Sequence, residues 1–333
     1  MTPEQIISDI TKGRFKPVYW LEGEEEYFID QVIHFAEQKI LSESEAGFNL
    51  TVFYGRDTSW ADVVNSCRRY PMFSDKQVVI LKEAQTMKDL DKLESYIEKP
   101  LISTLFFVAY KDKKVDGRTK LAKLLKEKAV LYTTKKIYEN QLPEWISDLV
   151  SSKGLTINKK ALFLLIDHIG NDLSRLSNEV DKLSLNLGDR KNITEDDIEL
   201  YIGVSKDFNV FELQHAIAQK DLYKAIRIVQ YFGANPKAAP LQLIFPSLYN
   251  FFSKVQMVYS VHSRDDKSVA QAIGVNSFFV KDYVQAAGRF HPQEIEKILL
   301  LLHKYNLKNI GIDDAGTEDS ELLKEMIVKM IAA

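Results

Sequence analysis

Cysteine is almost absent from this 333-residue sequence, in which Cys67 is the only one. A single thiol excludes internal disulfides and any zinc or iron–sulfur site built from several cysteines. An excess of one charge is also lacking: 44 basic and 47 acidic side chains give a formal net charge of −3, which excludes a globally basic protein that coats nucleic acid. At roughly 100–200 residues per domain, the length indicates two or three globular domains.

Long hydrophobic runs are missing as well, because no window reaches the roughly 18 uninterrupted apolar residues of a membrane span. The most apolar stretch, residues 241–261, is interrupted by Pro246, Asn250 and Lys254, so it predicts a buried helix. Residues 1–10 mix acidic side chains with isoleucines at helical spacing and indicate an amphipathic helix rather than a signal peptide. We expect a cytoplasmic protein without a membrane partner.

Short apolar runs alternate with helix-like segments in the first third of the chain. The alternation predicts a three-layer α/β domain with a mostly parallel sheet. The expected strands are residues 17–21, 49–54, 77–81, 104–109 and 129–133.

The strand signal ends near residue 138, and the remaining sequence has helical spacing. Glycines follow several of the expected helices at the position of a C-terminal cap. We therefore predict an α/β plus all-α protein with three domains: an α/β domain over 1–138, a small helical domain over 139–206 and a larger helical domain over 207–333.

The turn after the first strand is where an α/β nucleotide-binding domain holds phosphate. Here it contains Glu22, Gly23 and Glu24, followed by two more glutamates. A phosphate loop needs several glycines, a lysine and a hydroxyl group, and a cluster of carboxylates repels a triphosphate. The sequence predicts a degenerate turn that begins the next helix and binds no nucleotide.

Other chemical motifs are equally absent. Lys82 stands at the end of an apolar strand, where a nucleotidase would hold magnesium with an aspartate. The six histidines lack metal-ligand spacing, and the acidic cluster over residues 313–321 lacks the pattern of a calcium loop. Cys67 lies on an expected helix, which favours a structural thiol. We expect no catalytic residue, no metal and no cofactor.

Two apolar side chains, Met72 and Phe73, follow Pro71 in an expected loop between a helix and a strand. Loops normally run over the surface and are polar, and Met and aromatic side chains are favoured anchors at interfaces. The pair could fill a hydrophobic pocket on a partner. Alternatively, both side chains could fold back and seal the end of the preceding helix.

A basic run begins at Lys111 and includes four residues that could contact phosphates of DNA: Lys113, Lys114, Arg118 and Lys120. The run lacks the interleaved aromatic residues of a groove for single strands. A solvated helix face is therefore the alternative interpretation.

Four segments together resemble a known family. They are residues 16–23 (KPVYWLEG), 70–77 (YPMFSDKQ), 170–183 (GNDLSRLSNEVDKL) and 207–213 (DFNVFEL). In this order and spacing they are similar to the delta subunit of the bacterial DNA polymerase III clamp loader, and the resemblance extends over the whole length.

The resemblance implies an AAA+ architecture, with a RecA-like domain, a helical lid and a helical collar. It also implies a subunit of the DNA polymerase III holoenzyme that has no activity of its own and binds no ATP. Such a subunit binds the sliding clamp (beta subunit) and opens its ring. Its partners would be the tau/gamma and delta prime subunits and, through the complex, primed DNA.

The resemblance also implies a clamp-binding site at Met72 and Phe73, flanked by Pro71 and Arg68. The family often has a glutamine a few residues before the apolar pair, near the position of Arg68 here. An arginine donates hydrogen bonds but cannot accept them. The apolar pair would therefore carry more of the contact than in relatives that have the glutamine.

Three alternatives remain open. A delta prime-like subunit would typically carry a four-cysteine zinc module, for which this chain has only Cys67. A working phosphate-loop enzyme would bind ATP as an isolated chain. A helical interaction scaffold unrelated to the clamp would lose stability, but no partner, when Met72 and Phe73 are replaced.

Overall fold

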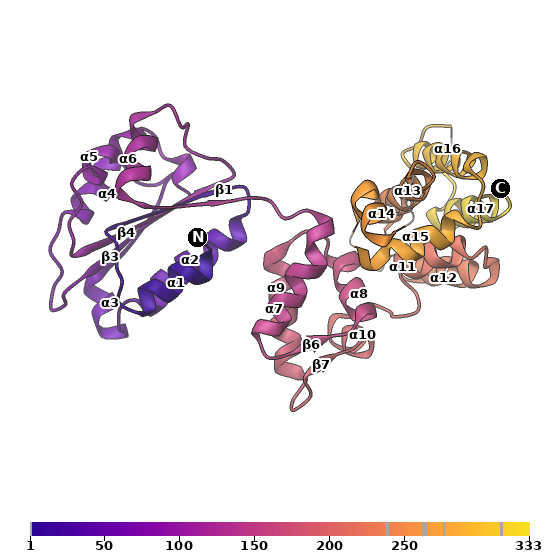
Figure 1. Cartoon of the computed structure of the whole chain (residues 1–333), viewed down its shortest axis with the longest axis horizontal. Helices are drawn as coiled ribbons and strands as arrows, with labels where there is room; N and C mark the ends of the chain where they lie inside the picture. Colours follow the sequence, from indigo (N-terminus) through magenta and orange to yellow (C-terminus); the bar gives the residue numbers. More distant parts are fainter. Residues whose placement is uncertain (1, 237–239, 262–264, 276, 314–315) are drawn as a thin grey trace. The chain divides into compact units, whose positions relative to one another are not determined.

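The computed structural model describes residues 2–236, 240–261, 265–275, 277–313 and 316–333. His262 and Asp314, considered above as potential metal ligands, lie outside these residues. The chain forms two compact units, Met1–Ile137 and Tyr138–Ala333 (Figure 1). A division of the second unit near residue 206 stays a prediction.

A parallel sheet forms the centre of the first unit. Its strands are β1 (Val18–Gly23), β2 (Leu50–Tyr54), β3 (Gln77–Lys82), β4 (Thr104–Lys111) and β5 (Val130–Thr134), in the order β2-β3-β4-β1-β5. Each neighbouring pair is parallel. All five expected strands are confirmed, within two residues at each end.

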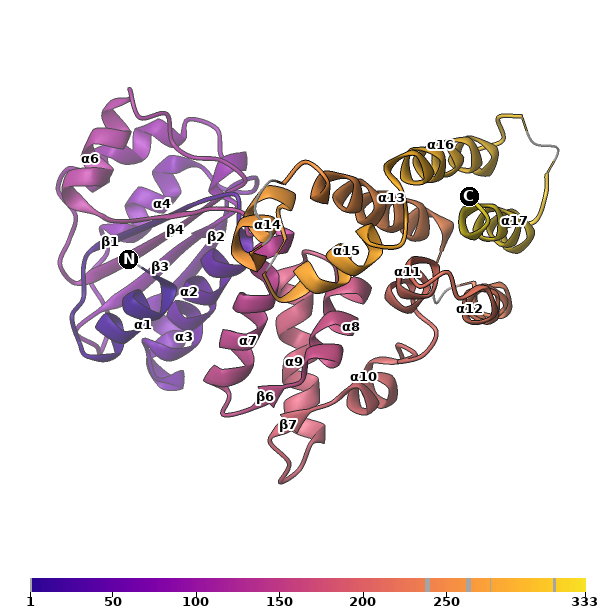
Figure 2. The ribbon, with the colours of Figure 1, turned by 45° about the vertical axis from the view of Figure 1, so that its right-hand side comes forward.

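Helices cover both faces of this sheet because side chains alternate between the two faces along each strand (Figure 2). In β1, Val18 and Trp20 pack on one side and Tyr19 and Leu21 on the other. The second side holds α1 (Pro3–Thr11) and α2 (Glu26–Lys39). The first side holds α4 (Trp60–Cys67), α5 (Glu94–Ile97) and α6 (Lys120–Lys128), with 3₁₀ turns at Ala84–Thr86 and Leu90–Leu93.

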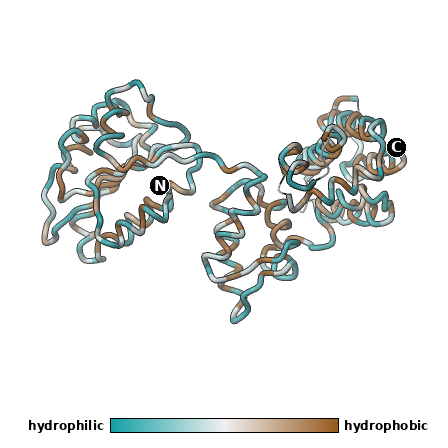
Figure 3. Tube along the Cα trace, in the orientation of Figure 1, coloured by the Kyte–Doolittle hydropathy of each residue, from teal (hydrophilic) through white to brown (hydrophobic). Residues whose placement is uncertain are grey.

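The strands are almost entirely apolar, as expected for a sheet that is buried on both sides. Figure 3 shows the hydrophobic colouring concentrated along them. Aromatic stacking adds to this core, since the rings of Tyr19 and Phe107 on neighbouring strands are parallel, with centroids 4.5 Å apart. The sheet is therefore a rigid platform for the loops at its two edges.

The second unit begins with a short 3₁₀ turn, Glu139–Gln141, followed by four helices, as expected for a small helical domain. These are α7 (Leu142–Ser152), α8 (Lys159–Ile169), α9 (Leu173–Asn186) and α10 (Glu195–Ile202). The prediction of no strands beyond residue 138 is wrong, because β6 (Thr156–Ile157) pairs with β7 (Asn192–Ile193). Strands of two residues are too short to show an alternating pattern.

Most of the remaining helices pack around one large apolar core, and a smaller separate core is formed by Val269, Ala270, Ile273 and Val280. A proline at position 246 lies inside α13, which continues past it. The helices are α11 (Val210–Ala218), α12 (Leu222–Ala234), α13 (Leu241–Val258), α14 (Asp266–Ile273), α15 (Val280–Ala287), α16 (Pro292–Asn309) and α17 (Asp319–Ile331), with a 3₁₀ turn at Ser277–Phe279. Among the described residues, no helix combines the length and the apolar character that crossing a membrane requires.

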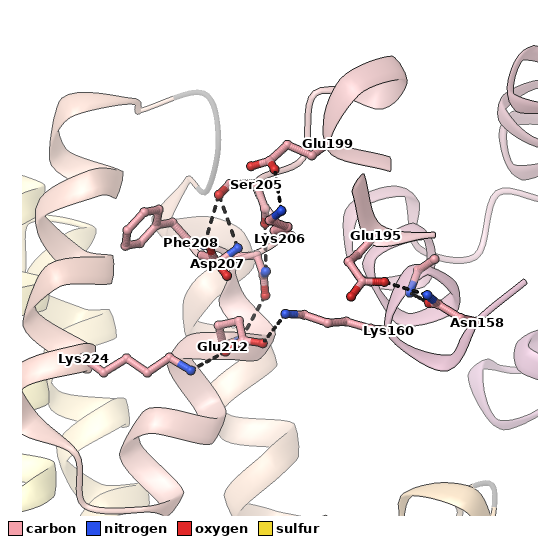
Figure 4. A network of polar contacts seen from close by, with 12 residues as sticks. Asn158, Lys160, Glu195, Glu199, Ser205, Lys206, Asp207, Phe208, Glu212 and Lys224 are labelled. Carbon is pink, nitrogen blue, oxygen red and sulfur yellow. Dashed lines mark hydrogen bonds and ion pairs between the residues drawn. The ribbon is translucent and has the colours of Figure 1, made fainter. Parts of the chain in front are cut away.

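Glu212, at the start of α11, connects helices from the early and late parts of this unit (Figure 4). Its carboxylate pairs with Lys160 of α8 at 3.5 Å and with Lys224 of α12. Nearby, the ring of Phe163 on α8 stacks on Phe211 of α11, with centroids 5.3 Å apart. One carboxylate and one aromatic pair thus join α8 to α11.

We predict that Glu212→Gln lowers the free energy of unfolding by about 1 kcal/mol, because both lysines lose a partly buried partner. Chemical denaturation of the full chain, in which unfolding of the second unit is followed, measures the loss. Asp181→Asn is the matched control, since it removes an ion pair to Lys153 in which Asp181 is half exposed. Equal losses in the two variants would contradict a special role for Glu212.

Candidate functional site

The carboxyl edge of the sheet carries the residues expected in the degenerate turn. The placement of Glu22 in that turn is wrong: Glu22 lies inside β1 and is only 5% exposed. Its carboxylate accepts hydrogen bonds from Trp20 Nε1 at 3.2 Å, the Val115 amide at 3.0 Å and Thr133 Oγ1 at 3.3 Å. Three donors satisfy the charge, which is why a glutamate can remain in a buried strand.

The turn itself begins after Gly23, and its main chain is already bonded within the protein. The Gly23 amide donates to the carbonyl of Lys113 at 3.1 Å, and the Glu25 amide to Thr134 Oγ1 at 3.1 Å. Gly23 has φ +128°, and a Cβ there would lie 2.4 Å from the carbonyl oxygen of Thr134. Glu24 is exposed, while Glu25 caps α2, and burial raises the pKa of the Glu25 carboxyl.

Lys111, at the end of β4, lies at the centre of an ion cluster at the same edge. Its Nζ is 3.0 Å from Glu26, 2.9 Å from Asp30 and 3.4 Å from Glu83. The placement of Lys111 in a solvated basic run is therefore wrong. Burial lowers the pKa of Lys111, but hydrogen bonds to Asp30 and Glu26 outweigh it and raise the pKa overall. Because a raised lysine pKa stabilises the folded state below about pH 10, the cluster contributes fully at neutral pH.

Lys82 and Cys67 have internal roles. Lys82, at the end of β3, pairs with Glu37 of α2 at 2.6 Å. Cys67 is fully buried under the sheet, and burial raises the pKa of its thiol, so the prediction of a structural thiol is confirmed. Within the described ranges, no group of three or more His, Cys, Asp or Glu side chains is arranged to hold a metal ion.

The amino edge of the sheet presents the Met72–Phe73 pair, in the loop before β3. Met72 is 54% exposed and Phe73 is 91% exposed. The alternative in which both side chains fold back to seal the helix is therefore wrong. Phe73 also has φ +56°, a left-handed conformation that is unfavourable for a residue with a bulky side chain.

Two buried amides fix the backbone of this loop. Asn49, at the end of α3 (Glu43–Asn49), accepts a hydrogen bond from the Met72 amide at 2.7 Å and donates one to the Met72 carbonyl at 2.8 Å. Gln77, the first residue of β3, donates to the Arg69 carbonyl at 2.6 Å and to Thr104 Oγ1 at 2.8 Å. Gln77 thus seals the end of α4, and the apolar pair is left free to point outward.

Other exposed apolar residues surround the pair. Phe48 of α3 makes an edge-to-face contact with Phe73, with ring centroids 6.4 Å apart, and Tyr70 is exposed beside Pro71. We call Phe48, Tyr70, Met72 and Phe73 the plug surface. Arg68 caps the end of α4, and its guanidinium donates to the Ser95 carbonyl at 3.5 Å, so no hydrogen-bond acceptor replaces the glutamine at this position.

The predicted DNA-contacting residues differ in their surroundings. Arg118 forms two-pronged hydrogen bonds with Asp116, and these lower the pKa of Asp116. Lys120 pairs with Glu94 at 3.4 Å. Lys113 and Lys114 are exposed, the first over the ring of Tyr110. Contact of these four residues with DNA stays a prediction.

Sequence reasoning missed helix α3 and therefore Phe48 and Asn49. A signal was available: Ser42 and Glu45 form a capping box, and this spacing of Ser and Glu is typical of a helix start. No local pattern indicates that Asn49 bonds to Met72, because 23 residues separate them.

The strand order is β2-β3-β4-β1-β5, and the described residues that follow form helices and one pair of two-residue strands. This arrangement defines an AAA+-like architecture, as predicted. Two family models match the chain in order. "DNA polymerase III, delta subunit" matches residues 19–135, and "DNA polymerase III delta subunit, C-terminal domain" matches residues 207–328. Together they match more than half of the sequence, and the chain belongs to the DNA polymerase III delta subunit family.

Relatives of full length support this assignment. The chain is 25% identical to DNA polymerase III subunit delta of Bacillus subtilis, over 97% of this chain and 95% of the relative. It is 24% identical to the probable delta subunit of Aquifex aeolicus, over 87% and 85%. Its fold matches the solved structure of the Bacillus subtilis DNA clamp loader delta protein with a TM-score of 0.59, 24% identity, and coverage of 99% and 100%.

We predict that Lys111→Met lowers the free energy of unfolding of the first unit by about 2 kcal/mol, because three carboxylates lose their shared cation. The loss is moderate because these carboxylates are about half exposed. Denaturant unfolding measures it, with Lys126→Met on the exposed face of α6 as the control. A Lys111 variant as stable as the control would show that the cluster contributes nothing.

Proposed function

We propose that this chain binds the sliding clamp through Met72 and Phe73 and opens the ring for loading onto primed DNA. The observation that carries the proposal is the pair itself: two large apolar side chains project into solvent from a loop that buried amides fix in place. Exposed aromatic and Met side chains on a fixed backbone are favourable anchors, since little conformational entropy is lost on binding.

Binding energy, rather than chemistry, would open the ring. A partner that binds the open ring more tightly than the closed ring shifts the equilibrium toward the open form. Burying a Met or Phe side chain contributes about 1.5–3 kcal/mol each, and Met72 is already about half covered, so the pair offers about 3–4 kcal/mol. Moving an equilibrium from 1:99 to 99:1 needs about 5.5 kcal/mol. For a shift of that size the pair alone would fall short, and further contact surface would be needed.

We also propose that the chain neither binds nor hydrolyses ATP and has no activity of its own. The Gly23 and Glu25 amides at the turn after β1 bond within the protein, and three carboxylates already bind Lys111 at the same edge. A phosphate group here would meet the carboxylates of Glu24, Glu25 and Glu26, and the Gly23 and Glu25 amides would not be free to bind it. ATP would be bound by other subunits of the loader.

The family assignment supports a proposal for how this chain joins other subunits of the loader. We propose that residues 207–333 form the collar that joins this subunit to the tau/gamma and delta prime subunits in the cytoplasm. Exposed apolar side chains of that region, such as Tyr223 and Leu300, are available for contacts between subunits.

We predict that the double variant Met72→Ala/Phe73→Ala loses at least a hundredfold in affinity for the sliding clamp of the same organism, because about 3–4 kcal/mol of apolar burial is removed. Surface plasmon resonance with immobilised clamp measures the affinity. The melting temperature should stay within about 2 °C, since both side chains are exposed.

Two results would contradict the proposal. A well-folded wild-type chain that does not bind the clamp would remove the function. Binding by the double variant at wild-type affinity would place the contact elsewhere on the chain. A variant that loses stability but keeps its binding would favour a structural scaffold.

We predict that isothermal titration of the purified chain with ATP and Mg²⁺ gives no saturable heat at millimolar concentration. The reason is that the Gly23 and Glu25 amides bond within the protein and that glutamates line the turn after β1. The positive control is an ATP-binding subunit of the same loader in the same buffer. Saturable binding at micromolar ATP would show that the chain is a working nucleotide-binding protein.

A further inference from the structure

We propose that helix α3 is a second element of the clamp-docking site, in which Phe48 contacts the clamp directly and Asn49 positions the Met72–Phe73 pair. This inference rests on the proposed function and extends it to residues outside the loop. It also supplies contact surface that the apolar pair lacks.

Phe48 has the properties of a contact residue. It lies in the last turn of α3, is 67% exposed, and its ring meets the ring of Phe73 edge to face at 6.4 Å. Because the two rings are neighbours, a partner surface that covers Phe73 on this side also reaches Phe48. The occupant of this surface is therefore the same clamp surface that receives the pair.

Asn49 has the properties of a positioning residue. Its side chain is 3% exposed and meets both polar groups of the Met72 main chain, accepting from the amide and donating to the carbonyl. The same Nδ2 also donates to the Glu45 carbonyl at 3.2 Å, which ties the amide group to its own helix. An asparagine that bonds to both groups of one residue fixes that backbone much as a neighbouring strand would.

The conformation of Phe73 requires stabilising contacts of this kind. Its φ of +56° is disfavoured for a bulky residue and persists only where the surrounding contacts impose it. Asn49 holds the residue before Phe73, and Glu45 of the same helix accepts a hydrogen bond from Ser74, the residue after it, at 2.7 Å. Contacts from α3 therefore hold the backbone on both sides of Phe73.

Glu45 can keep this role throughout the physiological range. Hydrogen bonds from Ser42 and Ser74 lower the pKa of its carboxyl to about 2, so it stays ionised and continues to accept them. The pair is thus presented in its binding conformation before the clamp arrives, and the loop need not become ordered on contact.

The test measures clamp affinity for Phe48→Ala and Asn49→Ala beside the wild type and the Met72→Ala/Phe73→Ala variant. We expect about tenfold weaker binding for each single variant, with an unchanged melting temperature for Phe48→Ala and a lower one for Asn49→Ala, which loses three partly buried hydrogen bonds. Leu185→Ala is the matched control for Phe48, since Leu185 is an exposed leucine of α9 in the second unit. It should bind the clamp as the wild type does.

A second readout separates positioning from a general structural role. Hydrogen exchange should show that the Met72 amide, which donates to Asn49, exchanges faster in Asn49→Ala while amides of the sheet stay protected. If Asn49→Ala fails to fold, Asn49→Ser takes its place, and the wild type provides a further measurement. In the wild type, adding the clamp should slow exchange of α3 amides as well as those of residues 70–76.

The outcomes distinguish this inference from the proposed function. If the double variant loses binding while Phe48→Ala and Asn49→Ala bind as the wild type does, the role of α3 is overturned and the proposed function stands. If the wild type itself does not bind the clamp, the proposed function fails, and this inference, which rests on it, fails as well. Absence of any clamp-induced protection in α3, with protection at residues 70–76, would likewise overturn the role of α3.

Discussion

The constraint on which the first unit depends is the binding of one buried ammonium group by three carboxylates. Lys111 ends β4, while Glu26 and Asp30 belong to α2 and Glu83 follows β3. The cluster joins three elements at the edge where related architectures hold a nucleotide. One positive and three negative charges leave the cluster itself negative, so Lys111 has no unpaired positive charge to offer a phosphate.

The opposite edge of the same sheet has the reverse character. There, uncharged amides of Asn49 and Gln77 hold a loop that exposes apolar side chains. A parallel sheet with cores on both faces holds its two edges rigidly. The first unit is an AAA+-like scaffold, and we propose that docking at one edge takes the place of nucleotide chemistry at the other.

Much of the fold could be predicted from local patterns, and the errors have identifiable causes. The five strands were predictable because each is a continuous apolar run. Glu22 was misplaced because a glutamate ordinarily ends a buried strand, whereas here three donors satisfy it. Lys111 was misplaced because its carboxylates come from distant segments. The outward direction of Met72 and Phe73 could not be predicted, since it depends on Asn49 and Gln77.

The sequence by itself determined the periodicities of the strands and helices, the lack of a phosphate loop, and the four segments that resemble the delta family, because each is a property of neighbouring residues. Only the tertiary structure decided which side chains act together. Asn49 meets Met72 across 23 residues, and Lys111 meets Asp30 across 81. Such contacts form only when parallel strands bring their ends to a common edge, and no local pattern contains that information.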